Sequence, residues 1–426
     1  MNLLDTASLV VTPNGYKASK LYSIVPSDGT GDMTFARTGD TATRVNSSGL
    51  IETVLANKPR LDYLGSTCPK LLLEPQRTNI ILQSQDISSA SWLKNATPTI
   101  VSNASVSPDG TTTADTIKND TGVAASIYQF FTVSANSTYT FSLFVKKATT
   151  KTHQGGVAIE FASGVTSKNL YVAFDEVNGT LTTLSTSTLT GIYNTIDLGS
   201  YWKFSITTTD NGSNTLLITS ISPTFTTNGT SIGYAIGSAR TIWGFQLEAG
   251  AYATSYIPTT TASVTRNADV CSKTSATALI GQTEGTMFFD GYFGNNADEI
   301  WLFLKKAGTA AVNDTIYLQK SGANKVAFNV YTGSTNQVYV EGGSYLLGSR
   351  IKIAAAYKSN SFALYVNGVQ IGTDSSGTVP TCDSIYIGTY SEDPTGPTFI
   401  ANKGINTTAL WKTRLTNQEL ATLTTI

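Results

Sequence analysis

Apolar and polar residues alternate with a period of two in several segments of this chain, which restricts those segments to β-structure. Tyr139–Val145 reads YTFSLFV, so that its odd-numbered residues are all apolar or aromatic. The pattern recurs in Trp202–Ile206 and Leu216–Ile221. Because successive side chains of a strand point to opposite faces, each segment predicts a strand with one buried face.

Asparagine-glycine dipeptides mark the turns between such strands. A type I′ turn needs positive φ at both central residues, and Asn-Gly tolerates this best. Asn178-Gly179 predicts one tight turn, and Asn367-Gly368 separates the alternating segment Phe362–Val366 from Val369–Ile371. The second case predicts an antiparallel hairpin.

The composition agrees with an all-β fold. Charged residues make up only 13% of the 426 residues, against about 25% in an average soluble protein. Surface polarity therefore comes from Thr, Ser, Asn and Gly, which disfavour helix interiors. The net charge of −1 offers no basic surplus for a phosphate backbone, so nucleic-acid binding is not expected.

The spacing of the strands predicts two antiparallel β-sandwiches (jelly rolls) in tandem, after a small β-rich N-terminal region. Around Pro258, a strand ending at Leu247 gives way to a Thr/Ala/Ser-rich linker. We expect an N-terminal region that packs on another element or a partner chain, two sandwiches and a linker between them; the expected bounds are 1–84, 85–260, 261–270 (the linker) and 271–426.

One short helix is predicted at the C-terminal end. Thr416 and Glu419 have the spacing of a capping box, in which each side chain bonds to the backbone of the other residue. Leu415 and Leu420 fit the hydrophobic staple that accompanies it. A helix of this length is stable only when it packs against the sandwich.

The cysteines indicate no function, and we expect neither a secretory leader nor a membrane span. Cys68, Cys271 and Cys382 are scattered and odd in number, so we expect three small buried thiols rather than a disulfide or metal framework. Met1–Pro26 lacks the basic and apolar regions of a secretory signal. No apolar run reaches the ~18 residues that span a bilayer.

Catalytic residues are not evident. His153 is the only histidine and lies beside two glycines, as in an exposed loop. Glycoside hydrolysis uses two carboxyl groups about 5–9.5 Å apart. Asp298 and Glu299 are neighbours, which point to opposite faces of a strand. The second sandwich has no strand-like segment with acidic residues two positions apart, so we expect no enzymatic activity, although carboxylates from distant strands are an alternative.

Calcium is the one cofactor for which the sequence offers ligands. Asp210 and Asp298 each lie in a loop rich in Asn and Asp, whose side-chain oxygens suit Ca²⁺. The spacing of a dedicated calcium loop is missing, and a plain polar turn is the alternative at both positions.

Aromatic residues are the candidates for sugar binding, because an exposed ring offers a flat apolar surface to a pyranose. Trp202 and Trp243 lie within alternating strands and are predicted to be core residues. The candidate platforms lie in the aromatic-rich second sandwich: Trp301, Tyr390, Tyr292 and Tyr331. For Trp301 and Tyr390, packing in the core is the competing interpretation.

A series of short segments resembles structural proteins of tailed bacteriophages, where such a block precedes a jelly roll similar to a carbohydrate-binding module. In those proteins, a segment like Gln246–Thr259, QLEAGAYATSYIPT, closes the jelly roll. The resemblance covers about the first 270 residues and implies that residues 1–84 attach to or pack in the virion. The segments of the block are Phe35–Arg37, Thr41–Asn46, Gly49–Glu52, Pro59–Tyr63 and Leu71–Asn79.

The C-terminal part resembles a laminin-G-like, concanavalin-A-like lectin sandwich. The matching segments are Ile353–Tyr357, Leu364–Gly368 and Leu410–Leu420. This resemblance implies a module that binds glycans or proteins, and the acidic catalytic strand of the related glycanases is not visible.

Together these features predict a non-enzymatic surface protein of a phage virion: a head or tail fibre, appendage or decoration. Its expected partners are other virion proteins and host-surface or environmental glycans. Single sugar sites are weak, and multivalent display raises apparent affinity by about 10²–10⁴, so we expect a homo-oligomer, first of all a trimer. A polysaccharide depolymerase and a purely architectural virion protein are the alternatives.

Overall fold

The computed structural model describes residues 2–150, 153–210, 212–225, 235–294, 299–309, 313–322, 324–390 and 404–426. In these residues the chain forms antiparallel β-sheets, one 3-10 helix (Leu3–Thr6) and one α-helix, α1 (Asn417–Thr424). The predicted all-β class and the short C-terminal helix are therefore confirmed. Among the described residues, no helix is long and apolar enough to cross a membrane.

The chain divides into two compact units, each discontinuous in sequence. Unit 1 comprises residues 1–40, 54–76 and 267–426, and unit 2 comprises residues 41–53 and 77–266. The sequence placed residues 1–84 in a region of their own. In the structure, most of them join the C-terminal sandwich, because their strands pair with strands that lie more than 230 residues later in the chain.

Unit 1 is built on one large sheet that closes around a core. Its strands are β1 (Leu9–Lys17), β2 (Lys20–Val25), β3 (Met33–Ala36), β6 (Arg60–Asp62), β7 (Lys70–Leu72), β22 (Val270–Lys273), β23 (Glu284–Tyr292), β24 (Ile300–Lys305), β25 (Thr315–Ser321), β26 (Lys325–Thr332), β27 (Thr335–Gly342), β28 (Arg350–Lys358), β29 (Phe362–Val366), β30 (Val369–Asp374), β31 (Ser384–Ile387) and β32 (Ile405–Trp411). The strand order is β27-β26-β25-β24-β31-β22-β3-β2-β1-β32-β23-β28-β29-β30; off this path, β7 pairs with β32, and β6 pairs with β7.

The N-terminal strands of unit 1 complete its sheet. β1 pairs with β32, and β3 pairs with β22. Leu21, Met33 and Phe35 are consequently buried in the same core as Phe289 and Phe328. These strands carry few large apolar residues of their own, so the C-terminal sandwich supplies most of the apolar surface that buries them.

A buried group of four charged residues, which we call the ion cluster, joins the three segments of unit 1. Arg37 Nη1 donates to Asp269 Oδ1 at 2.9 Å, and Arg60 Nη1 donates to Glu74 Oε2 at 2.6 Å. Arg60 also pairs with Asp269. Burial would lower the pKa of the Arg60 guanidinium, but the charges of Asp269 and Glu74 outweigh burial and raise the pKa above its ordinary value. Arg60 therefore stays positively charged inside the fold.

The hairpin predicted around Asn367-Gly368 is present. β29 pairs with β30 in antiparallel register, with Val366 opposite Val369. Asn367 and Gly368 have φ of 51° and 81°, the two positive values that a type I′ turn requires.

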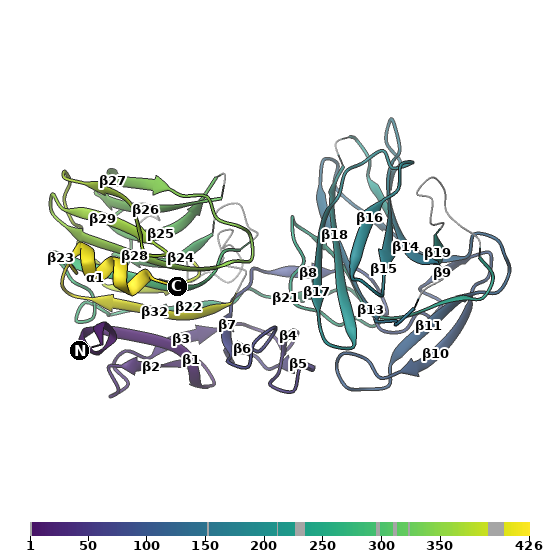
Figure 1. Cartoon of the computed structure of the whole chain (residues 1–426), viewed down its shortest axis with the longest axis horizontal. Helices are drawn as coiled ribbons and strands as arrows, with labels where there is room; N and C mark the ends of the chain where they lie inside the picture. Colours follow the sequence, from purple (N-terminus) through teal and green to yellow (C-terminus); the bar gives the residue numbers. More distant parts are fainter. Residues whose placement is uncertain are drawn as a thin grey trace. The chain divides into compact units, whose positions relative to one another are not determined.

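The capping box of α1 is also confirmed. Glu419 N–H donates to Thr416 Oγ1, and Thr416 N–H donates to Glu419 Oε2 at 2.7 Å. α1 packs on β28 and β29 (Figure 1) and buries Leu420 against the outer face of that sheet. Local chemistry thus starts the helix, and packing stabilises it.

Replacing Thr416 with alanine is expected to loosen α1 alone. Loss of an N-cap hydroxyl costs about 1 kcal/mol, so amide exchange in Asn417–Thr424 should accelerate about fivefold. Hydrogen exchange measured by mass spectrometry can test this. Gln418→Ala, on the exposed side of the helix, is the matched control, and equal exchange in both variants would contradict the role of the cap.

Unit 2 is a sandwich of two six-stranded antiparallel sheets, as expected for a jelly roll. One sheet contains β10 (Thr99–Ser105), β11 (Ala114–Asn119), β20 (Ser238–Ala249), β13 (Thr138–Lys146), β18 (Tyr201–Thr209) and β17 (Ile192–Asp197), in that order. The other contains β16 (Thr180–Thr183), β15 (Lys168–Asp175), β14 (Gln154–Ala162), β19 (Leu216–Phe225), β12 (Ser126–Thr132) and β9 (Leu93–Asn95). The short pairs are β4 (Ala42–Val45) with β5 (Ile51–Val54) and β8 (Arg77–Asn79) with β21 (Val264–Arg266).

The outer faces of the two sheets of unit 2 differ in exposure. The face of the β13 sheet is covered, since Phe144 and Trp243 are buried with Ile51 and Tyr256. Trp243 is therefore a core residue as predicted, whereas Trp202 is half-buried, with Lys147 Nζ 3.8 Å from its ring centroid. The outer side chains of the β14 sheet are mostly half-buried or exposed, so that face is the accessible one.

Candidate functional site

Trp301, a predicted sugar platform, lies in the core of unit 1, so the prediction of an exposed platform is wrong. Its side chain is fully buried and stacks on Phe289, with ring centroids 5.5 Å apart. A register shift between Ile300 and Leu302 interrupts the pairing of β24 with β25. Such a bulge breaks strict alternation, and both Trp301 and Leu302 consequently point into the core.

Tyr331 and Tyr390 come together, although they lie far apart in sequence. Both are half-buried against Phe303 and Tyr317 on the side of β24 and β25 opposite the core. The rings of Tyr331 and Tyr317 are 6.2 Å apart and nearly parallel, at 6°. Tyr292 lies elsewhere in unit 1, with Lys70 Nζ 4.2 Å from its ring centroid. A sugar-binding role for these three tyrosines stays a prediction.

The calcium prediction also stays untested. Asp298 lies outside the described residues. Asp210 is fully buried, and its Oδ1 accepts hydrogen bonds from Gly212 N and Asn214 Nδ2. Its Oδ2 makes no hydrogen bond in the described part of the chain, and neither does Asn214 Oδ1. Two such oxygens are far fewer than the six to eight that Ca²⁺ takes, and the described residues contain no cluster of three His, Cys, Asp or Glu side chains suited to a metal.

The cysteine prediction holds in part. Cys271 and Cys382 are buried, whereas Cys68 is exposed. Burial raises the pKa of the Cys271 thiol to about 12, so this side chain stays a neutral, inert thiol at physiological pH.

The accessible face of the β14 sheet carries two tyrosines in one cross-strand row. Tyr128 on β12 is opposite Ser220 on β19, Ser220 is opposite Ala158 on β14, and Ala158 is opposite Tyr171 on β15. The two tyrosine strands are three strand spacings apart, about 14 Å. Since only small side chains stand between them in this row, each ring has one side free of a large neighbour in the row.

The next row on the same face is more polar. Phe130 is opposite Ile218, Ile218 is opposite Glu160, and Glu160 is opposite Asn169. Phe130 is 59% exposed, and the other three are half-buried. An exposed aromatic ring, a carboxylate and an amide therefore lie beside the tyrosine row. We call the two rows together the two-tyrosine face.

Hydrogen-bonding groups on the two-tyrosine face are available to a ligand. Asn169 Oδ1 accepts from Thr188 N–H at 3.2 Å, which orients the amide, while its Nδ2 group bonds to no other described residue. Burial raises the pKa of Tyr171, and the nearby charge of Glu160 adds to this effect. The phenol of Tyr171 therefore stays protonated and can donate a hydrogen bond.

Sequence reasoning missed Tyr128 and Tyr171. Tyr171 lies in a segment with a clear period of two, KNLYVAFD, which predicts that it shares a side with polar neighbours. The segment of Tyr128, SIYQFFT, alternates less clearly, because Gln129 is on its buried side and Phe130 on its exposed side. The sequence does not show which strands are adjacent or in what register. The strand pairing places Tyr128 and Tyr171 in one row of the same face, with Ser220 and Ala158 between them.

The fold and the two-tyrosine face together define the class of this protein: a β-sandwich protein in which one sheet presents an accessible face of aromatic and polar side chains. No family model and no curated protein matches the chain. Part of the chain is similar to solved structures. The carbohydrate-binding module CBM40 of the Ruminococcus gnavus IT-sialidase, bound to alpha2,3 sialyllactose, has 15% identity and a TM-score of 0.30 over 34% of this chain and 84% of that chain.

Two further solved structures are similar at the same level. The NanB sialidase from Streptococcus pneumoniae has 14% identity and a TM-score of 0.31, covering 36% of this chain and 26% of its own. A SAP-like pentraxin from Limulus polyphemus has 13% identity and a TM-score of 0.26, covering 33% of this chain and 70% of its own. Likeness this weak assigns neither a ligand nor an activity to the chain.

Proposed function

We propose that this chain is a non-enzymatic protein of a bacteriophage virion surface, which binds host-surface or environmental glycans through the two-tyrosine face. The observation that carries the binding role is the row that sets Tyr128 and Tyr171 on either side of Ser220 and Ala158. The virion role rests on the phage-like segments of the sequence. Head or tail fibre, appendage and decoration are the positions that suit such a protein.

The chemistry of the two-tyrosine face suits a sugar. A pyranose ring has apolar C–H faces and an equator of hydroxyl groups. Tyr128 and Tyr171 offer ring surface for the apolar faces. Glu160 accepts hydrogen bonds from sugar hydroxyls, and the Asn169 amide donates them. A flat apolar surface beside both donors and acceptors matches a sugar better than it matches a wholly apolar ligand.

The same face supports binding without hydrolysis. A glycosidase uses two carboxyl groups on either side of the scissile bond. Within the two rows of the face, Glu160 is the only carboxylate. We therefore expect bound polysaccharide to stay intact, which a reducing-end assay on the incubated polysaccharide can check. Sustained release of reducing ends, lost in Glu160→Gln, would favour a depolymerase instead.

Binding through one such face is expected to be weak, because it is open to water and small in area. Display on a homo-oligomer, which we propose is a trimer, would raise the apparent affinity by about 10²–10⁴. Light scattering of the full chain measures its oligomeric state directly. A stable monomer at micromolar concentration would contradict the oligomer but leave single-site binding open to measurement.

A glycan array probed with the full chain tests the binding role. We expect a restricted set of glycans to bind the wild type and the Tyr339→Ala control, which removes a half-exposed tyrosine from unit 1. The Tyr128→Ala/Tyr171→Ala variant should bind none of them. An array that is blank for a multivalent form of the wild type would contradict glycan binding and favour a purely architectural role.

Peptide mapping of purified particles tests the virion role separately. The particles are those of the phage whose genome encodes this chain, and peptides from both units are expected. Failure to find them in particles that contain their other structural proteins would contradict the virion assignment.

A further inference from the structure

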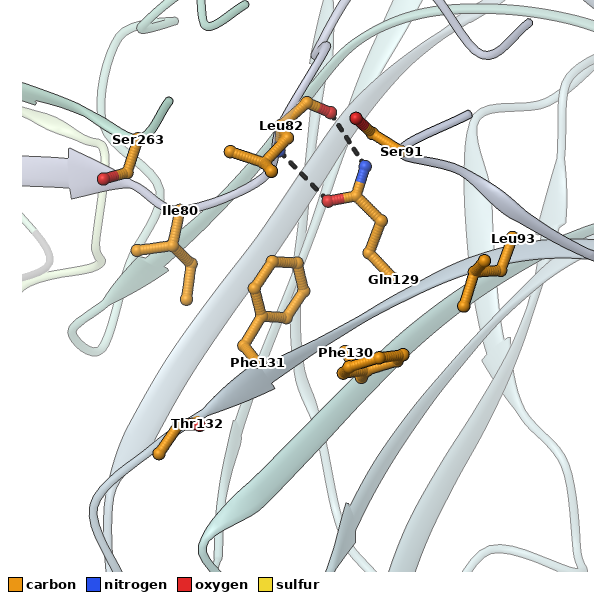
Figure 2. A pocket seen from close by; sticks show the side chains of 9 residues that line it. All are labelled: Ile80, Leu82, Ser91, Leu93, Gln129, Phe130, Phe131, Thr132 and Ser263. Atoms are coloured by element: carbon orange, nitrogen blue, oxygen red, sulfur yellow. Dashed lines mark hydrogen bonds between the residues drawn. The ribbon is translucent and has the colours of Figure 1, made fainter. Parts of the chain in front are cut away.

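An open pocket of about 490 Å³ lies along one edge of β12 in unit 2 (Figure 2). Ile80 and Leu82 line it from the segment that follows β8, and Phe131 points toward them. Leu93 on β9 and Phe130 on β12 line the other side. The pocket thus has two apolar walls with the edge of a strand between them. We call it the edge slot.

The strand edge in the slot has backbone groups with no strand beside them. β9 pairs with β12 only as far as Tyr128, and among the described residues no other strand pairs with that side of β12. Val133 N–H donates to Thr215 O at 2.9 Å, on the side of β19. Because backbone groups alternate in direction along a strand, those of Phe130 and Thr132 point away from β19 and into the slot.

Gln129 keeps the slot open. Its Nε2 donates to Leu82 O at 2.8 Å, and its Oε1 accepts from Leu82 N–H at 3.0 Å (Figure 2). These two bonds satisfy the backbone of Leu82 through a side chain, as a neighbouring strand would do through its backbone. The Ile80–Leu82 segment is therefore held beside β12 at a side chain's length and does not itself pair with Phe130 and Thr132.

The walls of the slot specify an uncharged occupant. None of the nine side chains that line it carries a charge, and its polar lining groups are the hydroxyls of Ser91, Thr132 and Ser263 and the amide of Gln129. A strand added to the edge would place alternate side chains toward the two walls. A charged side chain would lose water there without gaining a partner.

We propose that the edge slot binds an extended, uncharged peptide segment of another polypeptide, which adds to β12 as a strand. The open edge from Phe130 to Val133 spans about 13 Å, so it pairs with about four residues. Main-chain hydrogen bonds to Phe130 and Thr132 supply the directionality, and the walls select apolar side chains of moderate size. Peptide binding in the slot requires no glycan, and the slot shares one residue, Phe130, with the two-tyrosine face.

Binding of synthetic heptapeptides to the full chain tests the proposal. The probe alternates valine and threonine and is capped at both ends; the matched control peptide carries N-methyl groups at alternate residues, which removes the donors needed for strand addition. We expect the probe to bind, the N-methylated peptide to bind at least tenfold more weakly, and a lysine-substituted peptide likewise. Hydrogen exchange at Phe130 and Thr132 should slow when the probe is bound.

Two variants locate the binding. Thr132→Pro removes an N–H that points into the slot, at an edge position where proline is tolerated, and Leu82→Asp places a charge in one wall. Each variant should bind the probe peptide at least tenfold more weakly than the wild type, while its binding of glycans is unchanged. Equal binding of the probe by wild type and Thr132→Pro, or no slowing of exchange at Phe130 and Thr132 at saturating probe, would overturn the proposal.

Discussion

Asp269→Asn is expected to lower the free energy of unfolding of unit 1 by about 3–5 kcal/mol, because it leaves buried charges without their partner. Asp269 is fully buried between the guanidinium groups of Arg37 and Arg60. Asparagine has nearly the same shape but no charge, so within the ion cluster Glu74 would be the one carboxylate opposite two buried guanidinium groups. The segments that meet at the ion cluster should loosen together.

The measurement must separate the two units, since a two-unit chain need not unfold in a single step. Hydrogen exchange in increasing urea, read peptide by peptide, reports unit 1 and unit 2 independently. Lys325→Met is the control, because it removes an ion pair whose side chains are 43% and 23% exposed and should cost less than about 1 kcal/mol. A similarly small effect of Asp269→Asn would mean that the ion cluster contributes little to stability.

The second large effect is expected on the two-tyrosine face. Tyr128→Ala and Tyr171→Ala should each weaken glycan binding about tenfold, which corresponds to about 1.4 kcal/mol. The two rings stand on strands about 14 Å apart, so their effects should add and the double variant should lose about 100-fold. Titration calorimetry or surface plasmon resonance with a glycan chosen from the array measures all three variants.

Tyr128 and Tyr171 are both half-buried, so the effect of each substitution on the stability of the fold must be separated from its effect on glycan affinity. Tyr128→Phe and Tyr171→Phe keep the ring and remove only the hydroxyl. If stacking dominates, these variants bind nearly as well as the wild type. Loss of binding in Tyr128→Ala or Tyr171→Ala without loss of thermal stability places the ligand on the face, whereas unchanged binding in the double variant would exclude the face as the site.

The residues that carry the phage-like resemblance have a structural role that their sequence pattern did not reveal. Arg37, Arg60 and Glu74 lie in three of its segments, and all three join Asp269 in the ion cluster. Arg37 and Asp269 are 232 residues apart in the chain. These three residues therefore belong to the interior of unit 1, where their charges join its segments and do not form a binding surface.

The capping box at Thr416 and the turn at Asn367-Gly368 followed from the sequence, because each depends on residues no more than a few positions apart. The strand character of Tyr139–Val145 was predicted for the same reason, and that segment lies within β13. Trp301 was predicted wrongly because a single bulge reverses the side on which a residue points. The residues around Trp301 give no local sequence signal that predicts the bulge or the burial that it causes.

By itself, the sequence determined that this chain folds into antiparallel β-structure with a capped helix near its end, since alternation, turn chemistry and capping act over a few residues. Only the tertiary structure decided which strands are neighbours. That pairing brings the first 40 residues into the C-terminal unit, sets Tyr128 and Tyr171 on one face and leaves the edge of β12 open. The physical reason is that strand pairing joins backbone groups that are alike in every residue, so adjacency and register depend on how the whole core packs.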